Sequence, residues 1–174
     1  MKIRMIFIVS ALFFLTHCGY QSMYSDQNVN FRIANIQIIN DNKIGKRIER
    51  RLEIFQNNQN KSNVLNLEID SSFSKNISSK DKQGNPKTFN INVLVYLKYI
   101  QNSDVKKETS FSENTTYNNQ DDKFSLKNYE ESLIENLTDK IIDNILIYLQ
   151  SSTSGASNAK LTGNIGLIKS TNDN

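Results

Sequence analysis

Apolar residues recur along the chain with two different periods, and each change of period marks a new predicted element. Residues 31–39 are rich in β-branched side chains and are followed by the polar residues Asn40, Asp41 and Asn42, which predicts a short strand. Residues 43–56 then carry apolar side chains at spacings of four, four and three, as on one face of a helix. Any of the three polar residues before this helix could cap it. The apolar positions are Ile44, Ile48, Leu52 and Phe55.

Three long segments of alternating apolar and polar residues follow. Polar connections at 79–87 and 102–104 separate them, so the simplest pairing is an antiparallel meander. Strands of about twelve residues would each extend about 40 Å, at about 3.3 Å per residue. The positions that share one parity are Leu65, Leu67, Ile69, Ser71, Phe73 and Ile77, then Phe89, Ile91, Val93, Val95, Leu97 and Tyr99, then Thr109, Phe111, Thr115 and Tyr117.

The last periodic segment predicts a long helix from Leu126 to Gln150, which Ser125 could cap. From the order strand, helix, three strands and long helix, we predict an α+β fold with two helices packed on one face of a mostly antiparallel four-stranded sheet. The predicted domain spans residues 31–150. Ser, Thr, Gly and Asn dominate residues 151–174, which predicts a disordered polar tail.

The N-terminal segment leads to the only cysteine of the chain, Cys18. Lys2 and Arg4 precede the apolar run Met5–Leu15, and this order of charged and apolar regions is typical of a secretory signal. As a helix the run would extend only about 16 Å, at about 1.5 Å per residue, whereas the hydrocarbon core is about 30 Å thick. We therefore predict a lipoprotein signal peptide at residues 1–17 rather than a membrane span.

The residues before the cysteine, Leu15-Thr16-His17, resemble the lipobox of bacterial lipoproteins, whose cysteine is acylated before the signal is removed. His17 departs from the Gly, Ala or Ser of that pattern, which bears on how efficiently the signal is processed. Because no second cysteine is present for a disulfide, we predict that Cys18 is the lipidated residue. Residues 18–30 would form the lipidated tether, and Gly19, in place of a retention-type Asp, favours the outer membrane of a Gram-negative cell.

Composition argues against several classes of function. Removing Lys2 and Arg4 with the leader lowers the basic residues from 21 to 19 against 18 acidic ones, so the formal net charge falls from +3 to +1 and does not favour a nucleic-acid partner. After Cys18 the chain has no histidine, no second cysteine, and no phosphate loop, HExxH or GxSxG motif. Glu130 and Glu131 are expected to act as charges near a helix start. We expect no enzymatic activity, no cofactor and no metal site.

The start of the predicted mature chain, Cys18-Gly19-Tyr20-Gln21-Ser22-Met23-Tyr24, resembles the Cys-Gly-Phe-x-Pro-Leu-Tyr opening of the lipopolysaccharide-assembly lipoproteins, LptE, particularly the alphaproteobacterial type. Ser22 departs from the proline of that family. The first predicted helix, with Ile44-Gly45-Lys46-Arg47-Ile48 and Leu52, and the order of the later elements agree with the family as well. The resemblance covers about residues 15–150.

This resemblance implies a lipoprotein anchored by its N-terminal lipid on the periplasmic side of the outer membrane. It implies that the protein sits in the lumen of the outer-membrane barrel LptD, assists assembly of that barrel, and aids insertion of lipopolysaccharide into the outer leaflet. A second interpretation is a generic outer-membrane lipoprotein that acts as a periplasmic binding or pilotin-like module.

Lipid A carries phosphates, so a contact site for lipopolysaccharide needs cations that no neighbouring acid neutralises. Lys80, Lys82 and Lys87 lie in the predicted hairpin connection with a single acid, Asp81, and are our candidate lipopolysaccharide contact. A simpler interpretation is that these lysines keep the hairpin soluble. The alternative basic surface is on the first helix, where Glu49 and Glu53 are interleaved with Lys46, Arg47, Arg50 and Arg51.

Overall fold

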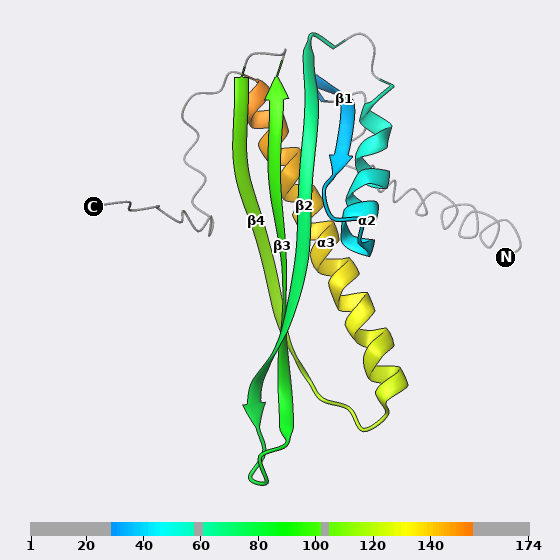
Figure 1. Ribbon diagram of the computed structural model, residues 1–174, viewed down its shortest axis with the longest axis vertical. Helices are drawn as coiled ribbons and strands as arrows, with labels where there is room; N and C mark the ends of the chain where they lie inside the picture. The colour runs from blue at the N-terminus through cyan, green and yellow to red at the C-terminus, as the bar shows by residue number, and fades with distance from the viewer. Residues whose placement is uncertain (1–28, 58–60, 102–104, 155–174) are drawn as a thin grey trace, which may run out of the picture.

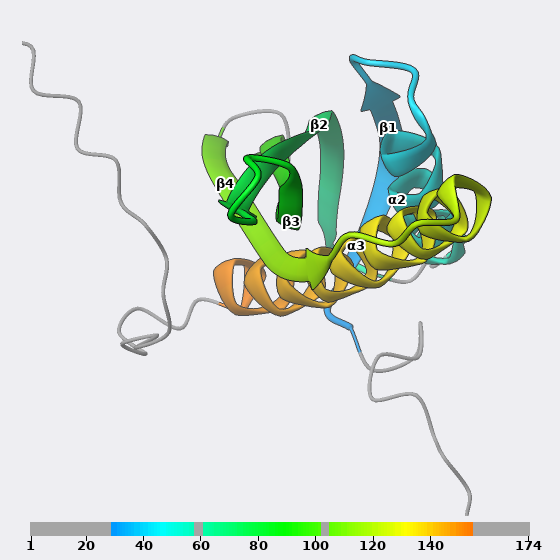
Figure 2. The same cartoon turned by 90° about the horizontal axis from the view of Figure 1, so that it is seen from below.

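A computed structural model describes residues 29–57, 61–101 and 105–154. It contains one four-stranded sheet in the order β1-β2-β3-β4, with α3 running alongside the sheet and α2 next to β1 (Figures 1 and 2). The predicted signal peptide and residues 18–28 of the predicted tether lie outside the described residues. The elements are β1 (Phe31–Ile38), α2 (Lys43–Leu52), a 3-10 turn (Glu53–Phe55), β2 (Asn63–Lys80), β3 (Pro86–Gln101), β4 (Val105–Asn118) and α3 (Lys123–Thr153).

The sheet is mixed, because β1 pairs parallel with β2 whereas β2 with β3 and β3 with β4 pair antiparallel. The predicted antiparallel meander of three strands is therefore confirmed. The parallel pairing of β1 requires a crossover connection, and α2 provides it. With 18 residues in β2 and 16 in β3, this hairpin is long, and its tip extends beyond β1 and α2 (Figure 1).

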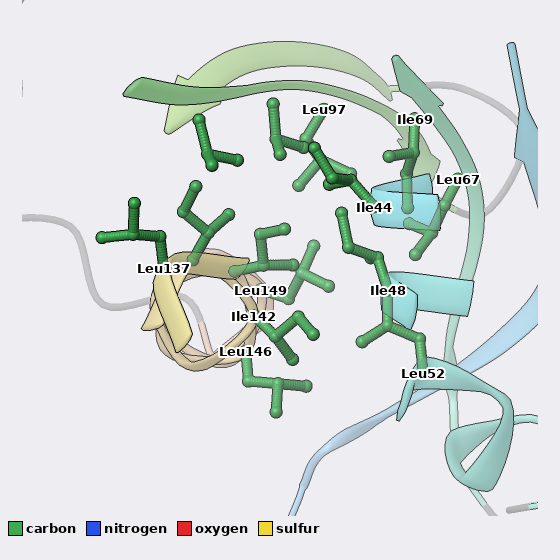
Figure 3. Packing of buried hydrophobic residues seen from close by; sticks show 14 of the residues in the cluster. Ile44, Ile48, Leu52, Leu67, Ile69, Leu97, Leu137, Ile142, Leu146 and Leu149 are labelled. Atoms are coloured by element: carbon green, nitrogen blue, oxygen red, sulfur yellow. The ribbon is translucent and has the colours of Figure 1, made fainter. Parts of the chain in front are cut away.

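The core lies where the helices meet alternate residues of the strands. On β2 and β3 the buried residues follow the predicted parity, from Leu65 to Ser71 and from Ile91 to Tyr99. The apolar side chains of α2 and α3 point toward this part of the sheet and belong to the same cluster (Figure 3). Members labelled in the figure are Ile44, Ile48 and Leu52 of α2, Leu67, Ile69 and Leu97 of the sheet, and Leu137, Ile142, Leu146 and Leu149 of α3.

The burial of β2 ends halfway along the strand. Phe73 and Ile77 share the parity of the buried residues, yet they are 55% and 49% exposed. The reason is that β1 and α2 reach the sheet only as far as Ser71, while the N-terminal half of α3 packs against β4, where Tyr117 contacts Tyr129 and Glu130. Alternation thus identifies the side of the strand that an apolar residue faces, but not whether another element covers it.

The helix starts are set by side-chain caps. Asn42 caps α2, because its Oδ1 accepts a hydrogen bond from the N–H of Gly45 at 2.9 Å. Asp122, rather than the predicted Ser125, caps α3, and its carboxylate accepts from the N–H groups of Phe124 at 3.1 Å and Ser125 at 3.2 Å. Helix α3 therefore begins before the predicted Leu126.

The folded body also extends further at both ends than the predicted 31–150. Val29 is 2% exposed, and Asn30 accepts a hydrogen bond of 2.7 Å from the hydroxyl of Thr153. Residues 151–153, predicted as tail, are the last residues of α3, and residues 155–174 lie outside the described part of the chain. Among the described helices, α3 included, none is both long enough and apolar enough to span a bilayer.

Leu137 tests the contact between α3 and the sheet, because its side chain is 3% exposed and belongs to the core cluster. We expect Leu137→Ala to lower the free energy of unfolding by about 2–5 kcal/mol, the usual cost of truncating a buried leucine. Urea denaturation measures it. The control is Ile147→Ala on the same helix, where the residue is 38% exposed and the loss should be much smaller. Equal losses would show that Leu137 is not a core residue.

Candidate functional site

The three candidate lysines gather at the tip of the long hairpin. Lys80 is the last residue of β2, Lys82 lies in the turn, and Lys87 is the second residue of β3. All three are exposed, and none of them belongs to the ion pairs found among the described residues. The three lysines therefore lie in one hairpin, with Lys82 in the turn and Lys80 and Lys87 on the strands beside it.

The only acid of this turn, Asp81, is bound by the turn's own backbone. Its Oδ1 accepts hydrogen bonds from the N–H groups of Asn85 at 2.8 Å and Gln83 at 2.9 Å. Gly84 has φ +88°, the left-handed conformation that glycine adopts without strain. The hydrogen bond from the Asn85 backbone is the largest of several that hold the pKa of Asp81 below its ordinary value. Asp81 thus remains ionised and shapes the loop that presents the lysines.

On the alternative basic surface of α2, acids of α3 neutralise Arg47. Arg47 donates through Nε and Nη2 to the two carboxylate oxygens of Asp139, at 2.8 Å and 2.9 Å. Its Nη1 lies 3.2 Å from Glu135. The sequence predicted partial neutralisation by Glu49 and Glu53, whereas the ion-pair partners of Arg47 are Asp139 and Glu135. The reason is that α2 packs beside α3, a contact between segments about ninety residues apart in the chain.

This double hydrogen bond changes the titration of both partners. The hydrogen bond from Arg47 is the largest cause that lowers the pKa of Asp139, and the same bond raises the pKa of Arg47. Both groups therefore stay charged near neutral pH. On the rest of the α2 surface, Lys46 forms an ion pair with Asp41 at 3.0 Å, while Arg50 is exposed.

A cavity of about 1070 Å³ lies between α2, α3 and the middle of β2. Its apolar lining comes from Ile44, Phe73 and Ile134, one residue from each element. Lys43 and Arg50 of α2 lie along the same cavity. Glu49 of α2 and Glu131 and Glu135 of α3 line it as well, so the cavity combines an apolar surface with charges of both signs. The described residues contain no group of His, Cys, Asp or Glu that could hold a metal ion.

A second polar contact joins the N-terminal half of α3 to the far half of the sheet. Glu130 Oε1 forms an ion pair with Lys75 of β2 and accepts a hydrogen bond of 2.7 Å from the hydroxyl of Tyr117 on β4. Lys75 Nζ also lies 4.2 Å from the ring centroid of Phe89. Burial, followed by the bond to Glu130, raises the pKa of Tyr117. Glu130, expected only as a charge near the helix start, therefore connects α3 to two strands.

Sequence reasoning did not identify the cavity or these two contacts. One signal in the sequence pointed to the edge of the cavity. Ser71, which lines it, is a polar residue between apolar neighbours of its own parity, and such a buried hydroxyl needs a hydrogen-bond partner, here Asn42 at the start of α2. Cys18, the predicted lipidation site, lies outside the described residues. The structure thus positions the hairpin lysines and the cavity but does not bear on the anchor.

The fold is that of several solved bacterial lipoproteins. Rare lipoprotein B from Shewanella oneidensis has 14% identity and a TM-score of 0.55, with 69% of this chain and 96% of that chain covered. Lipoprotein B from Nitrosomonas europaea has 16% identity and a TM-score of 0.55, with 78% and 94% covered. A minor lipoprotein from Acinetobacter baumannii has 11% identity and a TM-score of 0.51, with 72% and 94% covered. No protein-family model and no curated protein matches the sequence.

These three structures are lipoproteins of Gram-negative bacteria, and the architecture that they share with this chain is the LptE-like fold. At such low identities the likeness establishes the fold alone. The predicted class, α+β with a four-stranded sheet and two helices, is confirmed at this level.

Arg47 provides a test of the α2–α3 contact through its pH dependence. We expect Arg47→Gln to lower the free energy of unfolding at neutral pH by about 1 kcal/mol or less, because the pair is partly exposed. Since the folded-state pKa of Asp139 is lowered, this contribution is present above the ordinary Asp pKa of about 3.9 and is lost as the pH falls through the lowered value. Urea denaturation of both proteins should give curves that differ at pH 7 and converge at the acid end.

The matched control is Lys43→Gln. Lys43 also pairs with an acid of α3, at 3.3 Å, but its side chain is 88% exposed, so its removal should change stability little at any pH. A difference between Arg47→Gln and the unmodified protein that persists undiminished in acid would contradict the assignment to an ionised Asp139.

Proposed function

We propose that the chain is an outer-membrane lipoprotein of the lipopolysaccharide-assembly kind, LptE, and that it plugs the LptD barrel, assists its assembly and aids insertion of lipopolysaccharide into the outer leaflet. The observation that carries the proposal is the LptE-like fold shared with the rare lipoprotein B structures. The N-terminal motif that resembles the LptE opening supports it independently, because it lies outside the residues that define the fold. The proposed role is structural and requires no enzymatic activity, cofactor or metal.

The shape and surface of the described body support a role as a plug. A strand of 18 residues extends about 60 Å if straight, and a helix of 31 residues extends about 47 Å, so the body is elongated. We infer that both helices cover the same face of the sheet, which the shared core cluster supports. The wide lumen of a large outer-membrane barrel is polar and holds water, so a plug there needs a polar surface and a rigid core.

The anchor in this proposal is Cys18. Two or three acyl chains at one cysteine would bind a membrane far more firmly than a single chain, since each buried methylene contributes about 0.8 kcal/mol. The tether would then lead from the lipid to Val29, where the packed body begins. In this proposal the domain lies on the periplasmic side of the outer membrane.

A second candidate function is a generic outer-membrane lipoprotein that acts as a periplasmic binding or pilotin-like module. The open cavity of about 1070 Å³ between α2, α3 and β2 favours this alternative, because a partly apolar site of that size could hold a small hydrophobic ligand. The two functions differ in their partner, which makes them separable by isolation of the complex.

Co-purification tests the proposed function. The full-length chain with a C-terminal affinity tag would be isolated from detergent-solubilised outer membranes of its own cells. We expect an LptD barrel of about 700 residues or more to accompany it, since a plug inside a barrel remains bound when the membrane dissolves. Recovery of the lipoprotein without a barrel would leave the binding-module alternative.

The same cells test the anchor. Labelling with radioactive palmitate should mark the unmodified chain and leave Cys18→Ala unlabelled, because Cys18 is the only cysteine of the sequence. Labelling that persists in the variant would place the lipid elsewhere and refute this part of the proposal.

The hairpin lysines are the proposed lipopolysaccharide contact. Replacing Lys80, Lys82 and Lys87 together by Ser should weaken binding of purified lipopolysaccharide, because no ion pair among the described residues neutralises these cations. The effect should be larger at about 0.05 M salt than at about 0.3 M, where screening shortens the range of the charges. Fluorescence anisotropy with labelled lipopolysaccharide measures both.

The matched control removes the same number of lysines from α3, by Lys123→Ser, Lys127→Ser and Lys140→Ser. Equal losses in both triple variants would indicate a general charge effect. Unchanged affinity and unchanged salt dependence in the hairpin variant would exclude the hairpin and leave the α2 surface as the next candidate.

A further inference from the structure

A row of apolar side chains crosses the sheet next to the hairpin that carries the candidate lysines. Ile77 of β2 lies opposite Phe89 of β3, and Phe89 lies opposite Tyr117 of β4. The ring centroids of Phe89 and Tyr117 are 5.7 Å apart, and those of Tyr117 and Tyr129 of α3 are 6.0 Å apart. These four residues, the apolar row, connect three strands to α3.

Both ends of the apolar row are open to solvent, while its middle is packed. Ile77 is 49% exposed and Tyr129 is 43% exposed, whereas Tyr117 between them is 5% exposed. Phe89 is half-buried and packs against the core cluster. The exposed apolar ends are therefore held by strands and a helix, in a fixed position relative to one another.

The three hairpin lysines lie a few residues from the apolar row. Lys80 follows Ile77 by three residues on β2, and Lys87 precedes Phe89 by two residues on β3. At about 3.3 Å per residue, each of these separations along the backbone is about 10 Å or less. Because no ion pair among the described residues includes Lys80, Lys82 or Lys87, their charges are not neutralised by a side chain of the described body.

Two acids near the row and the lysines are engaged by neighbouring groups. Asp81 accepts hydrogen bonds from two backbone N–H groups of its own turn. Glu130 forms an ion pair with Lys75, whose ammonium group lies over the ring of Phe89, and also accepts from the hydroxyl of Tyr117. Lys75 and Glu130 thus neutralise each other beside the row. In the hairpin itself, three cations stand against the single acid Asp81.

Other exposed apolar side chains of β2 and β3 have different neighbours. Phe73, 55% exposed, lines the cavity that carries charges of both signs. Tyr96, 53% exposed on the opposite side of the sheet, lies across from Asp70. The apolar row, in contrast, adjoins lysines that no acid pairs with. An apolar peptide would leave these cations unused, whereas a lipid with phosphates and acyl chains would contact both kinds of group.

We propose that the apolar row holds an acyl chain of the same lipopolysaccharide molecule whose phosphates bind Lys80, Lys82 and Lys87. The chain lies over Ile77 and extends toward Tyr129, so its hydrocarbon leaves water while the phosphates stay at the solvated hairpin. Ile77 is then the residue through which the protein distinguishes an acylated ligand from a deacylated one. This inference rests on the proposed lipopolysaccharide contact and adds the acyl part of the ligand to it.

Two fluorescein-labelled probes test the proposal, lipopolysaccharide and the same lipopolysaccharide after chemical removal of its acyl chains. Each is titrated with the full-length lipoprotein in one detergent at one concentration, and binding is measured by fluorescence anisotropy. The unmodified chain should bind the acylated probe more tightly. Ile77→Ser should weaken binding of the acylated probe about tenfold, on the scale of one lost aliphatic contact, and leave binding of the deacylated probe unchanged.

Three further variants separate this contact from other effects. Ile77→Val keeps a branched apolar side chain and should retain most of the affinity. Tyr96→Ser, at a similarly exposed position on the opposite side of the sheet, should change neither affinity. The triple hairpin variant without Lys80, Lys82 and Lys87 should weaken binding of both probes, because both retain the phosphates. Urea denaturation should show that Ile77→Ser folds with nearly unchanged stability, since its side chain is already half exposed.

Several results would overturn the proposal. Equal losses for the two probes in Ile77→Ser, or no loss for either, would show that Ile77 does not contact an acyl chain. A loss in Phe73→Ser in place of Ile77→Ser would put the chain in the cavity beside α2. If the unmodified protein binds both probes with equal affinity, the acyl contact fails while the phosphate contact stands. If it binds neither, the proposed lipopolysaccharide contact fails as well.

Discussion

The rest of the structure depends on a polar junction between the start of α2 and the middle of β2. Asn42 Oδ1 accepts from the N–H of Gly45 and from the hydroxyl of Ser71 at 3.0 Å, while its Nδ2 donates to the carbonyl of Ser71. Ser71 is 2% exposed, so its hydroxyl would be an unpaired buried group without Asn42. A Cβ on Gly45 would lie 2.7 Å from Cγ2 of Ile38, so glycine permits this close approach of helix and sheet. These hydrogen bonds place the start of α2 beside Ser71 of β2.

Ser71 therefore marks a boundary between two parts of β2. On one side of Ser71, β1, α2 and α3 bury the alternate apolar residues of β2 and β3 in a single core. On the other side the β2–β3 hairpin continues to a cationic tip. Val93 and Ile91 of β3 are still buried there, whereas Phe73 and Ile77 of β2 are exposed.

Helix α3 connects the two parts over its whole length. Near its C-terminal end Thr153 binds Asn30 at the start of the body, and in its middle Asp139 binds Arg47 of α2. Toward its N-terminal end Glu130 binds Lys75 on the open half of β2. These contacts explain how a hairpin that extends beyond its core is held in a defined position relative to the helices. Such rigidity is what the proposed plug requires.

The sequence by itself determined the type and order of the elements and the hairpin lysines around Asp81, because these follow from periodicity and turn chemistry within a few residues. Only the tertiary structure decided that β1 runs parallel to β2, that Asp139 neutralises Arg47, and that Phe73 remains exposed although its parity matches the core. Each of these depends on which distant segment lies beside a residue. The physical reason is that periodicity reports the side that a residue faces, whereas burial and charge pairing depend on the position and length of the element opposite.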